Sequence, residues 1–169
     1  MKAGEAELGI GTEFEPDAAL SAVPLFTDRL VAVLPEGHAA ERRRSLKLRE
    51  VVAGPLILMD PQSSVRALFD QACALAGLSA TPVYEATYMS TAVGLVRAGL
   101  GIAVLPSSAV DLRIAPVLQT RLIEGPSLTR QIVLVSRAGR SLSPAAEAFV
   151  AALRDGLAKP GNARGARAC

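Results

Sequence analysis

Short, continuous runs of apolar residues constrain the fold of this chain more than any other feature of its sequence. They occupy residues 8–10, 30–34, 56–59, 102–105 and 132–135, each bounded by glycine, proline or polar residues. Runs of this length are typical of strands. Because the runs are not alternating, both faces of the sheet must be covered, and helical patterns lie between several of them. The sequence therefore predicts an α/β fold containing parallel β-α-β units.

Apolar periodicity and capping residues predict three helices and one short turn. A helix over residues 64–76 begins at Ser63 or Ser64 and ends before Gly77, with its apolar face formed by Val65, Leu68, Phe69, Ala72, Leu75 and Ala76. A second begins at Ser90 or Thr91 and ends at Gly99. The last has Ser143 as its cap, Pro144 at its first position and an apolar stripe of Phe149, Ala152, Leu153 and Leu157. A helical turn capped by Ser107 follows Pro106.

Composition limits the classes of function. A chain of 169 residues with 50% hydrophobic residues forms one domain or two small lobes. Its net charge of +2 is too small to attract nucleic acid or an anionic membrane. Neither an export signal nor a membrane span is visible, so a cytoplasmic location is expected. Cys73 and Cys169 are the two cysteines, which excludes a disulfide framework or a zinc cluster.

Motifs for catalysis, cofactors and metals are absent from the sequence. His38, the one histidine, lies in a turn pattern and is expected at the surface rather than as a general base. There is no nucleophile elbow and no phosphate-binding loop, and Gly9-Ile10-Gly11 is only a fragment of a dinucleotide motif. Asp60 reads as a turn former more readily than as a strand-end acid. Residues 41–44 read as a solvated loop more readily than as a phosphate site. We therefore expect no enzyme activity, no cofactor and no metal.

Hydroxyl residues recur where the predicted helices begin, at Ser63-Ser64, Ser90-Thr91 and Ser107-Ser108. In an open parallel sheet, helix N-termini present unpaired N–H groups and a positive dipole end beside the carboxyl ends of the strands. Such a crevice favours a small anion. Each serine taken singly is read more simply as a helix cap.

An ordered set of segments resembles the effector-binding domain of LysR-type transcriptional regulators. The matching segments are residues 6–11, 24–25, 28–35, His38, 48–51, 55–58, 64–66, 91–106, 130–137 and 142–145. They cover about residues 4–157, and their order is more specific than any one of them. The resemblance implies a two-lobe fold like type 2 periplasmic binding proteins, with mixed, mostly parallel sheets and a small-molecule cleft between the lobes.

By that analogy, residues 1–36 form part of lobe one, 37–127 form lobe two, 128–157 return to lobe one, and 158–169 are a flexible tail. The resemblance places the following candidates for effector binding in the cleft: Gly11, Thr12, Pro24, Pro61, Gln62, Ser63, Ser64, Ser90 and Thr91. The effector would be a small metabolite, expected to be anionic. Lobe one is expected to be incomplete in this chain, which predicts self-association into a homo-oligomer through uncovered edges. DNA contact would require a helix-turn-helix domain that this chain lacks.

Within the resemblance, Cys73 matches the second cysteine of the peroxide-sensing branch, whereas Ser64 stands where the first would be. A thiol switch is therefore not expected, and Cys73 is predicted to be a small buried thiol. Two other classes stay open: a solute-binding protein of a transporter with the same fold, and a small α/β enzyme, for which the sequence offers no motif.

Overall fold

The chain forms two compact units in the computed structural model, which describes residues 6–12, 18–110 and 116–158. Unit 1 combines Met1–Asp28 with Arg130–Cys169, and unit 2 spans Arg29–Thr129. The chain therefore crosses from unit 1 to unit 2 after Asp28 and returns after Thr129. The lobe limits anticipated at residues 36 and 127 stay a prediction, and the predicted tail lies, from residue 159 on, outside the described residues.

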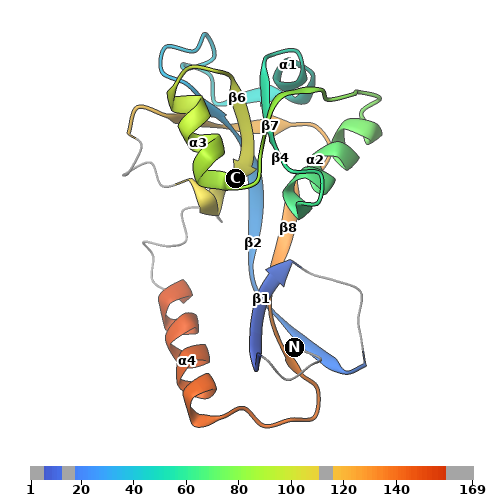
Figure 1. Cartoon of the computed structure of the whole chain (residues 1–169), viewed down its shortest axis with the longest axis vertical. Helices are drawn as coiled ribbons and strands as arrows, with labels where there is room; N and C mark the ends of the chain where they lie inside the picture. Colours follow the sequence, from blue (N-terminus) through green and yellow to red (C-terminus); the bar gives the residue numbers. More distant parts are fainter. Residues whose placement is uncertain (1–5, 13–17, 111–115, 159–169) are drawn as a thin grey trace. The chain divides into compact units, whose positions relative to one another are not determined.

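A mixed sheet of largely apolar strands forms the centre of unit 2 (Figure 1). It contains the second half of β2 (Leu20–Leu34) together with β4 (Leu56–Met59), β5 (Pro82–Ala86) and β6 (Ile102–Pro106). The order is β2-β6-β4-β5; β4 is parallel to both β5 and β6, whereas β2 is antiparallel to β6. Every residue of β4 and β6 is buried, as a sheet covered on both faces requires. The predicted α/β fold is thus confirmed.

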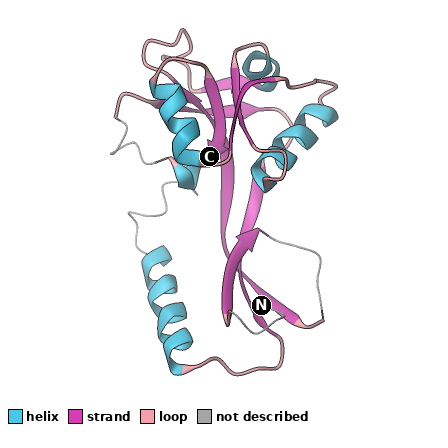
Figure 2. Cartoon of the chain, viewed as in Figure 1, coloured by secondary structure: helices cyan, strands magenta, loops and turns pink. Residues whose placement is uncertain are grey.

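A smaller group of elements extends this sheet on the far side of β2. Strand β7 (Gln119–Glu124) pairs antiparallel with β2 and parallel with β3 (Ser45–Lys47). Helix α1 (Leu48–Val52) follows β3 directly, and its residues Leu48 and Val51 are buried. The helices and strands of unit 2 alternate along most of its length (Figure 2).

Helices α2 (Ser64–Leu75) and α3 (Met89–Arg97) cover opposite faces of the unit 2 sheet. The connection β4–α2–β5 runs one way across the sheet and β5–α3–β6 runs back, because β5 and β6 flank β4 on opposite sides. Right-handed crossovers then place the two helices on different faces, and Figure 1 shows one on each side of the strands.

The apolar face of α2 agrees with the prediction in its first turns and departs from it at the end. Phe69 and Cys73 are buried, whereas Leu75 is 73% exposed and Ala76 is also exposed, so these last two assignments were wrong. The N–H of Leu78 donates to the carbonyl of Cys73 (2.8 Å) after the positive φ of Gly77, and Leu78 packs against the core in place of Leu75.

Helix α3 begins earlier than predicted, and the turn after Pro106 is arranged differently. The carbonyl of Tyr88 accepts from the N–H groups of Thr91 (3.0 Å) and Ala92 (3.2 Å), so Tyr88 is the N-cap and neither Ser90 nor Thr91 is a cap. The 3-10 turn η1 (Ser107–Ala109) has Pro106 as its N-cap, so the capping role predicted for Ser107 was wrong. Gly99 ends α3 with φ +75°, as predicted.

Unit 1 contains the antiparallel pair β1 (Leu8–Thr12) and β8 (Thr129–Arg137), together with α4 (Pro144–Ala158). Ser143 caps α4, because its Oγ accepts from the N–H of Ala146 (3.3 Å). Phe149 is 50% exposed and Ala152 is exposed, which corrects the predicted stripe. The buried or half-buried residues that share a face of α4 are Ala146, Val150, Leu153 and Leu157, so the predictions for Leu153 and Leu157 were correct.

Candidate functional site

The candidate residues of unit 2 gather at the carboxyl ends of two neighbouring parallel strands. Pro61, Gln62 and Ser63 form the turn between β4 and α2, whereas Ser90 and Thr91 lie in the first turn of α3 after β5. The two strand ends are joined directly, since the N–H of Asp60 donates to the carbonyl of Ala86 (3.0 Å). The structure therefore brings two of the three predicted hydroxyl clusters, Ser63-Ser64 and Ser90-Thr91, to one edge of the sheet.

Asp60 shapes the first of these turns, as the sequence predicted. Its Oδ1 accepts from the N–H of Gln62 (2.8 Å), and its carbonyl accepts from the N–H of Ser63 (2.9 Å). Ser63 then caps α2, because its Oγ accepts from the N–H of Val65 (3.2 Å). Ser64, the first residue of α2, is exposed. Ser63 is thus the N-cap of α2, whereas Ser64 is exposed at its first position.

This edge is the point at which the chain connections reverse direction. The turn after β4 leads to the helix on one face, and the turn after β5 leads to the helix on the other face. Open α/β sheets bind ligands in the crevice outside strand ends where this reversal occurs. The first N–H groups of an α-helix lack intrahelical partners, and the macrodipole places partial positive charge there. The arrangement suits a small anion.

Arg66 holds α2 against both strand ends, a role that the sequence did not reveal. One of its guanidinium nitrogens, Nη1, donates to the carbonyl of Met59 (3.2 Å) and to Glu85 (2.8 Å), and its Nε donates to Asp70 (2.9 Å). The Glu85 hydrogen bond is the first cause that raises the pKa of Arg66 above its ordinary value. Only its helical position relative to Asp70 could have been read from the sequence, since Glu85 lies on the next strand.

The candidates of unit 1 lie on two strands. Gly11 and Thr12 end β1, where they pair with Val133 and Ile132 of β8. Both are half-buried, whereas Pro24 is exposed within β2. These three residues belong to unit 1 and the other six to unit 2.

A buried ion pair lies where the chain leaves unit 1 and returns to it. Asp28 is 1% exposed, and its Oδ2 accepts from Nη2 of Arg130 (3.1 Å). The residues beside them are also joined, because Oγ1 of Thr27 donates to the side-chain oxygen of Gln131 (3.0 Å). The sequence predicted neither contact, because each joins residues far apart in the chain.

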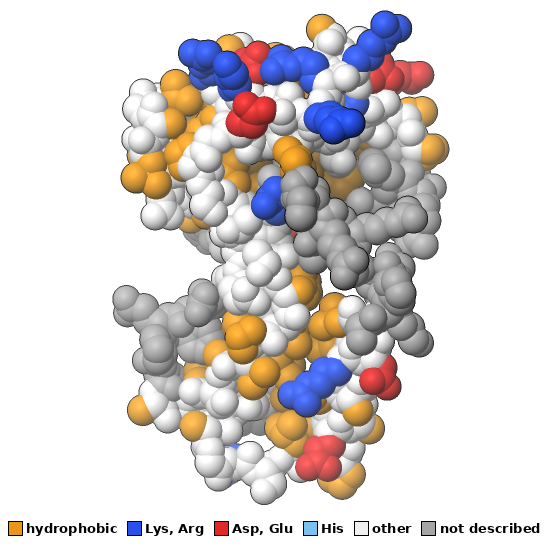
Figure 3. All heavy atoms as spheres, turned by 180° about the vertical axis from the view of Figure 1, so that it is seen from behind, with side chains coloured by type: hydrophobic (Ala, Val, Ile, Leu, Met, Phe, Trp, Pro, Cys, Tyr) orange, Lys and Arg blue, Asp and Glu red, His pale blue; other side chains and the backbone are white. Residues whose placement is uncertain are grey.

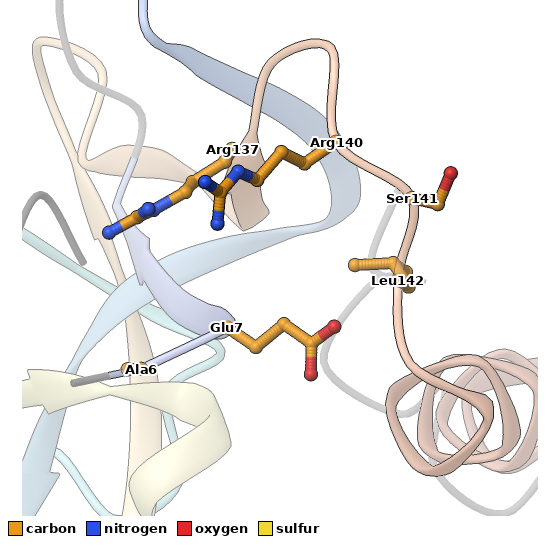
Figure 4. A pocket seen from close by; sticks show the side chains of 6 residues that line it. All are labelled: Ala6, Glu7, Arg137, Arg140, Ser141 and Leu142. Atoms are coloured by element: carbon orange, nitrogen blue, oxygen red, sulfur yellow. The ribbon is translucent and has the colours of Figure 1, made fainter. Parts of the chain in front are cut away.

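Two open hollows are lined by residues other than the candidates. One, of about 230 Å³, lies in unit 2 beside His38, Arg43 and Glu50. The other, of about 280 Å³, lies in unit 1 beside Glu7, Arg137 and Arg140 (Figure 4). The sequence singled out none of the unit 1 residues as a site.

The sequence also drew attention to His38, residues 41–44 and Cys73. Their contacts in the structure indicate structural roles. Nδ1 of His38, which is half-buried, accepts from the N–H of Ala40 (3.1 Å) in the predicted turn. Residues 41–44 are exposed, and Arg43 pairs with Glu50 (2.8 Å). Figure 3 shows basic and acidic side chains mixed over the end of unit 2 that carries α1. Cys73 is a buried free thiol whose pKa is raised, first by burial and then by Asp70, as expected for an inert thiol.

Within the described ranges 6–12, 18–110 and 116–158, no group of three or more His, Cys, Asp and Glu residues could hold a metal ion. Over the same residues, no helix has the length and hydropathy needed to cross a bilayer.

The fold and the sequence both match a known family of regulatory domains. A family model described as the LysR substrate binding domain matches residues 1–158. The chain belongs to this family. The resemblance that the sequence motifs indicated is thereby confirmed, and the solute-binding alternative gains no support from the relatives of the LysR domain, which are transcriptional regulators.

Two relatives give the extent of the match. The LysR domain is 28% identical to the HTH-type transcriptional regulator YybE of Bacillus subtilis over 149 residues. The match covers 88% of this chain and 50% of YybE. It is 30% identical to the HTH-type transcriptional regulator YfeR of Shigella flexneri over 155 residues. That match covers 92% of this chain and 50% of YfeR. The chain thus spans about half the length of these two regulators.

Two solved regulatory domains share the fold. The regulatory domain of CcmR from Synechocystis PCC6803, in complex with 2-PG, superposes with a TM-score of 0.81 at 18% identity, covering 95% of this chain and 77% of that chain. The effector-binding domain of QuiR, in complex with shikimate, gives a TM-score of 0.76 at 24% identity, covering 91% of this chain and 73% of that chain.

Proposed function

We propose that this LysR domain senses a small anionic metabolite, and that unit 2 contributes to its site at the carboxyl ends of β4 and β5. The observation that carries the proposal is the convergence of the α2 and α3 N-termini at this edge, with Ser64 and Thr91 exposed there. Hydroxyl groups and helix N–H groups are good donors to carboxylate and phosphate oxygens. Arg66 supports the site indirectly, because it fixes α2 against the strands.

The proposed effector is a carboxylate or phosphate metabolite. Two domains of the same fold were solved in complex with shikimate and with 2-PG, and shikimate is a carboxylate. In unit 1, Gly11, Thr12 and Pro24 are the proposed contributors to effector binding. An effector changes the output of a regulator only through different affinities for two states of the protein.

We propose further that the LysR domain acts within a longer regulator. DNA binding would be performed by a helix-turn-helix domain, since YybE and YfeR are HTH-type transcriptional regulators. The effector would then regulate DNA binding rather than undergo a reaction. We further propose a cytoplasmic location and a homo-oligomeric state.

Isothermal titration calorimetry of the chain with a panel of small carboxylates that includes shikimate tests the proposal. At least one carboxylate should bind saturably, and Ser64→Ala and Thr91→Val should each weaken binding roughly 3- to 10-fold, as the loss of one hydrogen bond predicts. Ser79→Ala is the matched control, because Ser79 is an exposed serine of the same unit outside both helix starts. Unchanged affinity in both site variants would refute the proposed site.

A further inference from the structure

Asp60 has one carboxylate oxygen that the described contacts do not use, and it lies beside the proposed effector site. The N–H of Asp60 donates to the carbonyl of Ala86 (3.0 Å), so Asp60 lies where the ends of β4 and β5 are joined. Its Oδ1 accepts from the N–H of Gln62 (2.8 Å), which holds the carboxylate on the turn that leads into α2. Among the residues that the structure describes, no hydrogen bond or ion pair involves Oδ2 of Asp60. One oxygen thus forms the turn, and the other can accept from a ligand.

The charge of Asp60 is not balanced by a cation of the same edge. Asp60, Arg66 and Glu85 are the charged residues in the two segments that form this edge, 60–66 and 85–91. The guanidinium of Arg66 already donates to Glu85 (2.8 Å) and to Asp70 (2.9 Å). Asp60 itself is half-buried. A carboxylate that has lost part of its hydration gains from a hydrogen-bond donor, because an unbonded buried acceptor costs free energy.

A structural role accounts for only part of what Asp60 offers. Aspartate and asparagine both form such turns through one side-chain oxygen, and a negative charge near a helix start interacts favourably with the macrodipole. Neither role requires a partner for Oδ2. In dinucleotide-binding α/β folds, an acidic residue accepts from a hydroxyl group of the ligand. Oδ2 of Asp60 has the chemistry for the same contact.

We propose that Asp60 is a specificity-determining residue of the effector site, which accepts a hydrogen bond from a hydroxyl or ammonium group of the ligand. The inference rests on the proposed function and narrows the effector to carboxylates that carry such a donor on a nearby carbon. The carboxylate of the ligand would lie at the starts of α2 and α3, and its donor group would face Oδ2. A ligand without a donor brings a second negative charge toward Asp60 with nothing to offset the repulsion. A phosphate dianion is disfavoured for the same reason.

Nuclear magnetic resonance titration of the chain with butyrate, β-hydroxybutyrate and β-aminobutyrate tests the inference, because these probes share one carbon skeleton. The backbone N–H signals of Ser64 and Thr91 report binding at constant ionic strength. At least one of the two donor-bearing probes should bind at least roughly fivefold more tightly than butyrate, as a hydrogen bond to a charged group predicts. The tighter of the two identifies the donor as a hydroxyl or an ammonium group.

The outcomes separate this inference from the proposed function. Saturable binding of all three probes with equal affinity would overturn the role of Asp60 and still support a carboxylate site at the two helix starts. Absence of saturable shifts with all three would count against the proposed function and against this inference with it.

Asp60→Asn separates ligand contact from turn formation. Asparagine keeps a side-chain oxygen for the N–H of Gln62 but places an amide group where Oδ2 was. The preference for the donor-bearing probe should fall to within about twofold, whereas butyrate should bind roughly twofold more tightly because the repulsion is removed. A folding defect would weaken the binding of every probe, so opposite changes exclude it.

Glu36→Gln is the matched control, because Glu36 is an exposed acidic residue of unit 2 outside this edge. It removes the same charge from the chain and should keep the preference of roughly fivefold. A preference that persists in Asp60→Asn, or one that is lost equally in Glu36→Gln, would overturn the inference.

Discussion

At the scale of single residues, Gly101 is the position where packing allows no side chain. A Cβ at Gly101 would lie far inside van der Waals contact of the carbonyl oxygen of Pro55, and that oxygen accepts the N–H of Ile102 (2.9 Å). Gly94, in the exposed part of α3, has no atom within 4 Å of an added Cβ. Within one helix-turn-strand segment, Gly94 thus has space for a side chain and Gly101 does not.

Gly101→Ala should lower the free energy of unfolding by about 3 kcal/mol, because the backbone of Pro55 or the start of β6 must move. Gly94→Ala should raise it by about 0.5–1 kcal/mol, because alanine favours the helix. Urea denaturation followed by circular dichroism measures both. Similar destabilisation by the two substitutions would contradict the assigned contact at Gly101.

The sequence predicted buried residues best where apolar residues are continuous and less well at the ends of helices. All residues from Leu56 to Met59 are buried as expected. Leu75 and Phe149 are large and apolar yet exposed, because one lies beyond the last packed turn of α2 and the other lies one position off the stripe of α4. Helical periodicity shows which residues share a face but not which face meets the sheet.

At the scale of elements, α1 depends on one carboxylate that the sequence did not single out. Both oxygens of Glu50 accept from the guanidinium of Arg43 (2.8 and 2.9 Å), and one also accepts from the N–H of Lys47 (2.7 Å). The pKa of Glu50 is lowered from 4.5 to about 2, first by the Arg43 hydrogen bonds and next by the Lys47 N–H. The ionised form is thus favoured by folding.

A carboxyl group whose pKa is lower in the folded than in the unfolded protein stabilises the fold at pH values above its unfolded pKa. That stabilisation is lost as the pH falls through the folded pKa. The difference in urea midpoint between wild type and Glu50→Gln should therefore be largest near about pH 7 and shrink between about pH 4.5 and about pH 2. Glu36→Gln is the control, because exposed Glu36 makes no ion pair among the described residues. A difference for Glu50→Gln that is constant over this pH range would contradict the role of its charge.

The apolar runs in the sequence located the central strands but neither β5 nor β7. Strands β4 and β6 are continuous apolar runs that have neighbours on both sides. Strand β5 is an edge strand whose middle residues, Val83, Tyr84 and Glu85, are exposed, and β7 is mostly half-buried. A continuous apolar run indicates burial on two faces, and these two strands lack it.

At the scale of the whole molecule, the sequence predicted which strand ends and helix starts meet, but not the contacts that hold them together. Hydroxyl residues after apolar runs located Ser63, Ser64, Ser90 and Thr91 near helix starts, although Tyr88 rather than Ser90 caps α3. The ion pairs Arg66–Glu85 and Asp28–Arg130 and the hollow beside Arg140 depend on contacts between segments distant in the chain. Such contacts leave no periodic pattern in the sequence.

Self-association is the remaining prediction at this scale, and the edge of the unit 2 sheet offers a surface for it. Strand β5 ends the strand order and has β4 as its partner, so its outer backbone groups face no other described strand. Val83 is 60% exposed and Tyr84 38% exposed on that strand. Unpaired edges with apolar side chains are where chains pair with one another.

Val83→Lys should weaken self-association of the chain at least roughly tenfold, because a lysine at a sheet edge opposes strand pairing and must lose its hydration in an interface. Sedimentation equilibrium over roughly 1–100 µM protein measures the dissociation constant. Val117→Lys is the matched control, since Val117 is 45% exposed and lies outside every strand. A wild-type chain that stays monomeric over this range, or equal weakening by both substitutions, would exclude β5 as the contact. Association that persists unchanged in Val83→Lys would instead direct attention to unit 1, where Ile10 of β1 is 54% exposed.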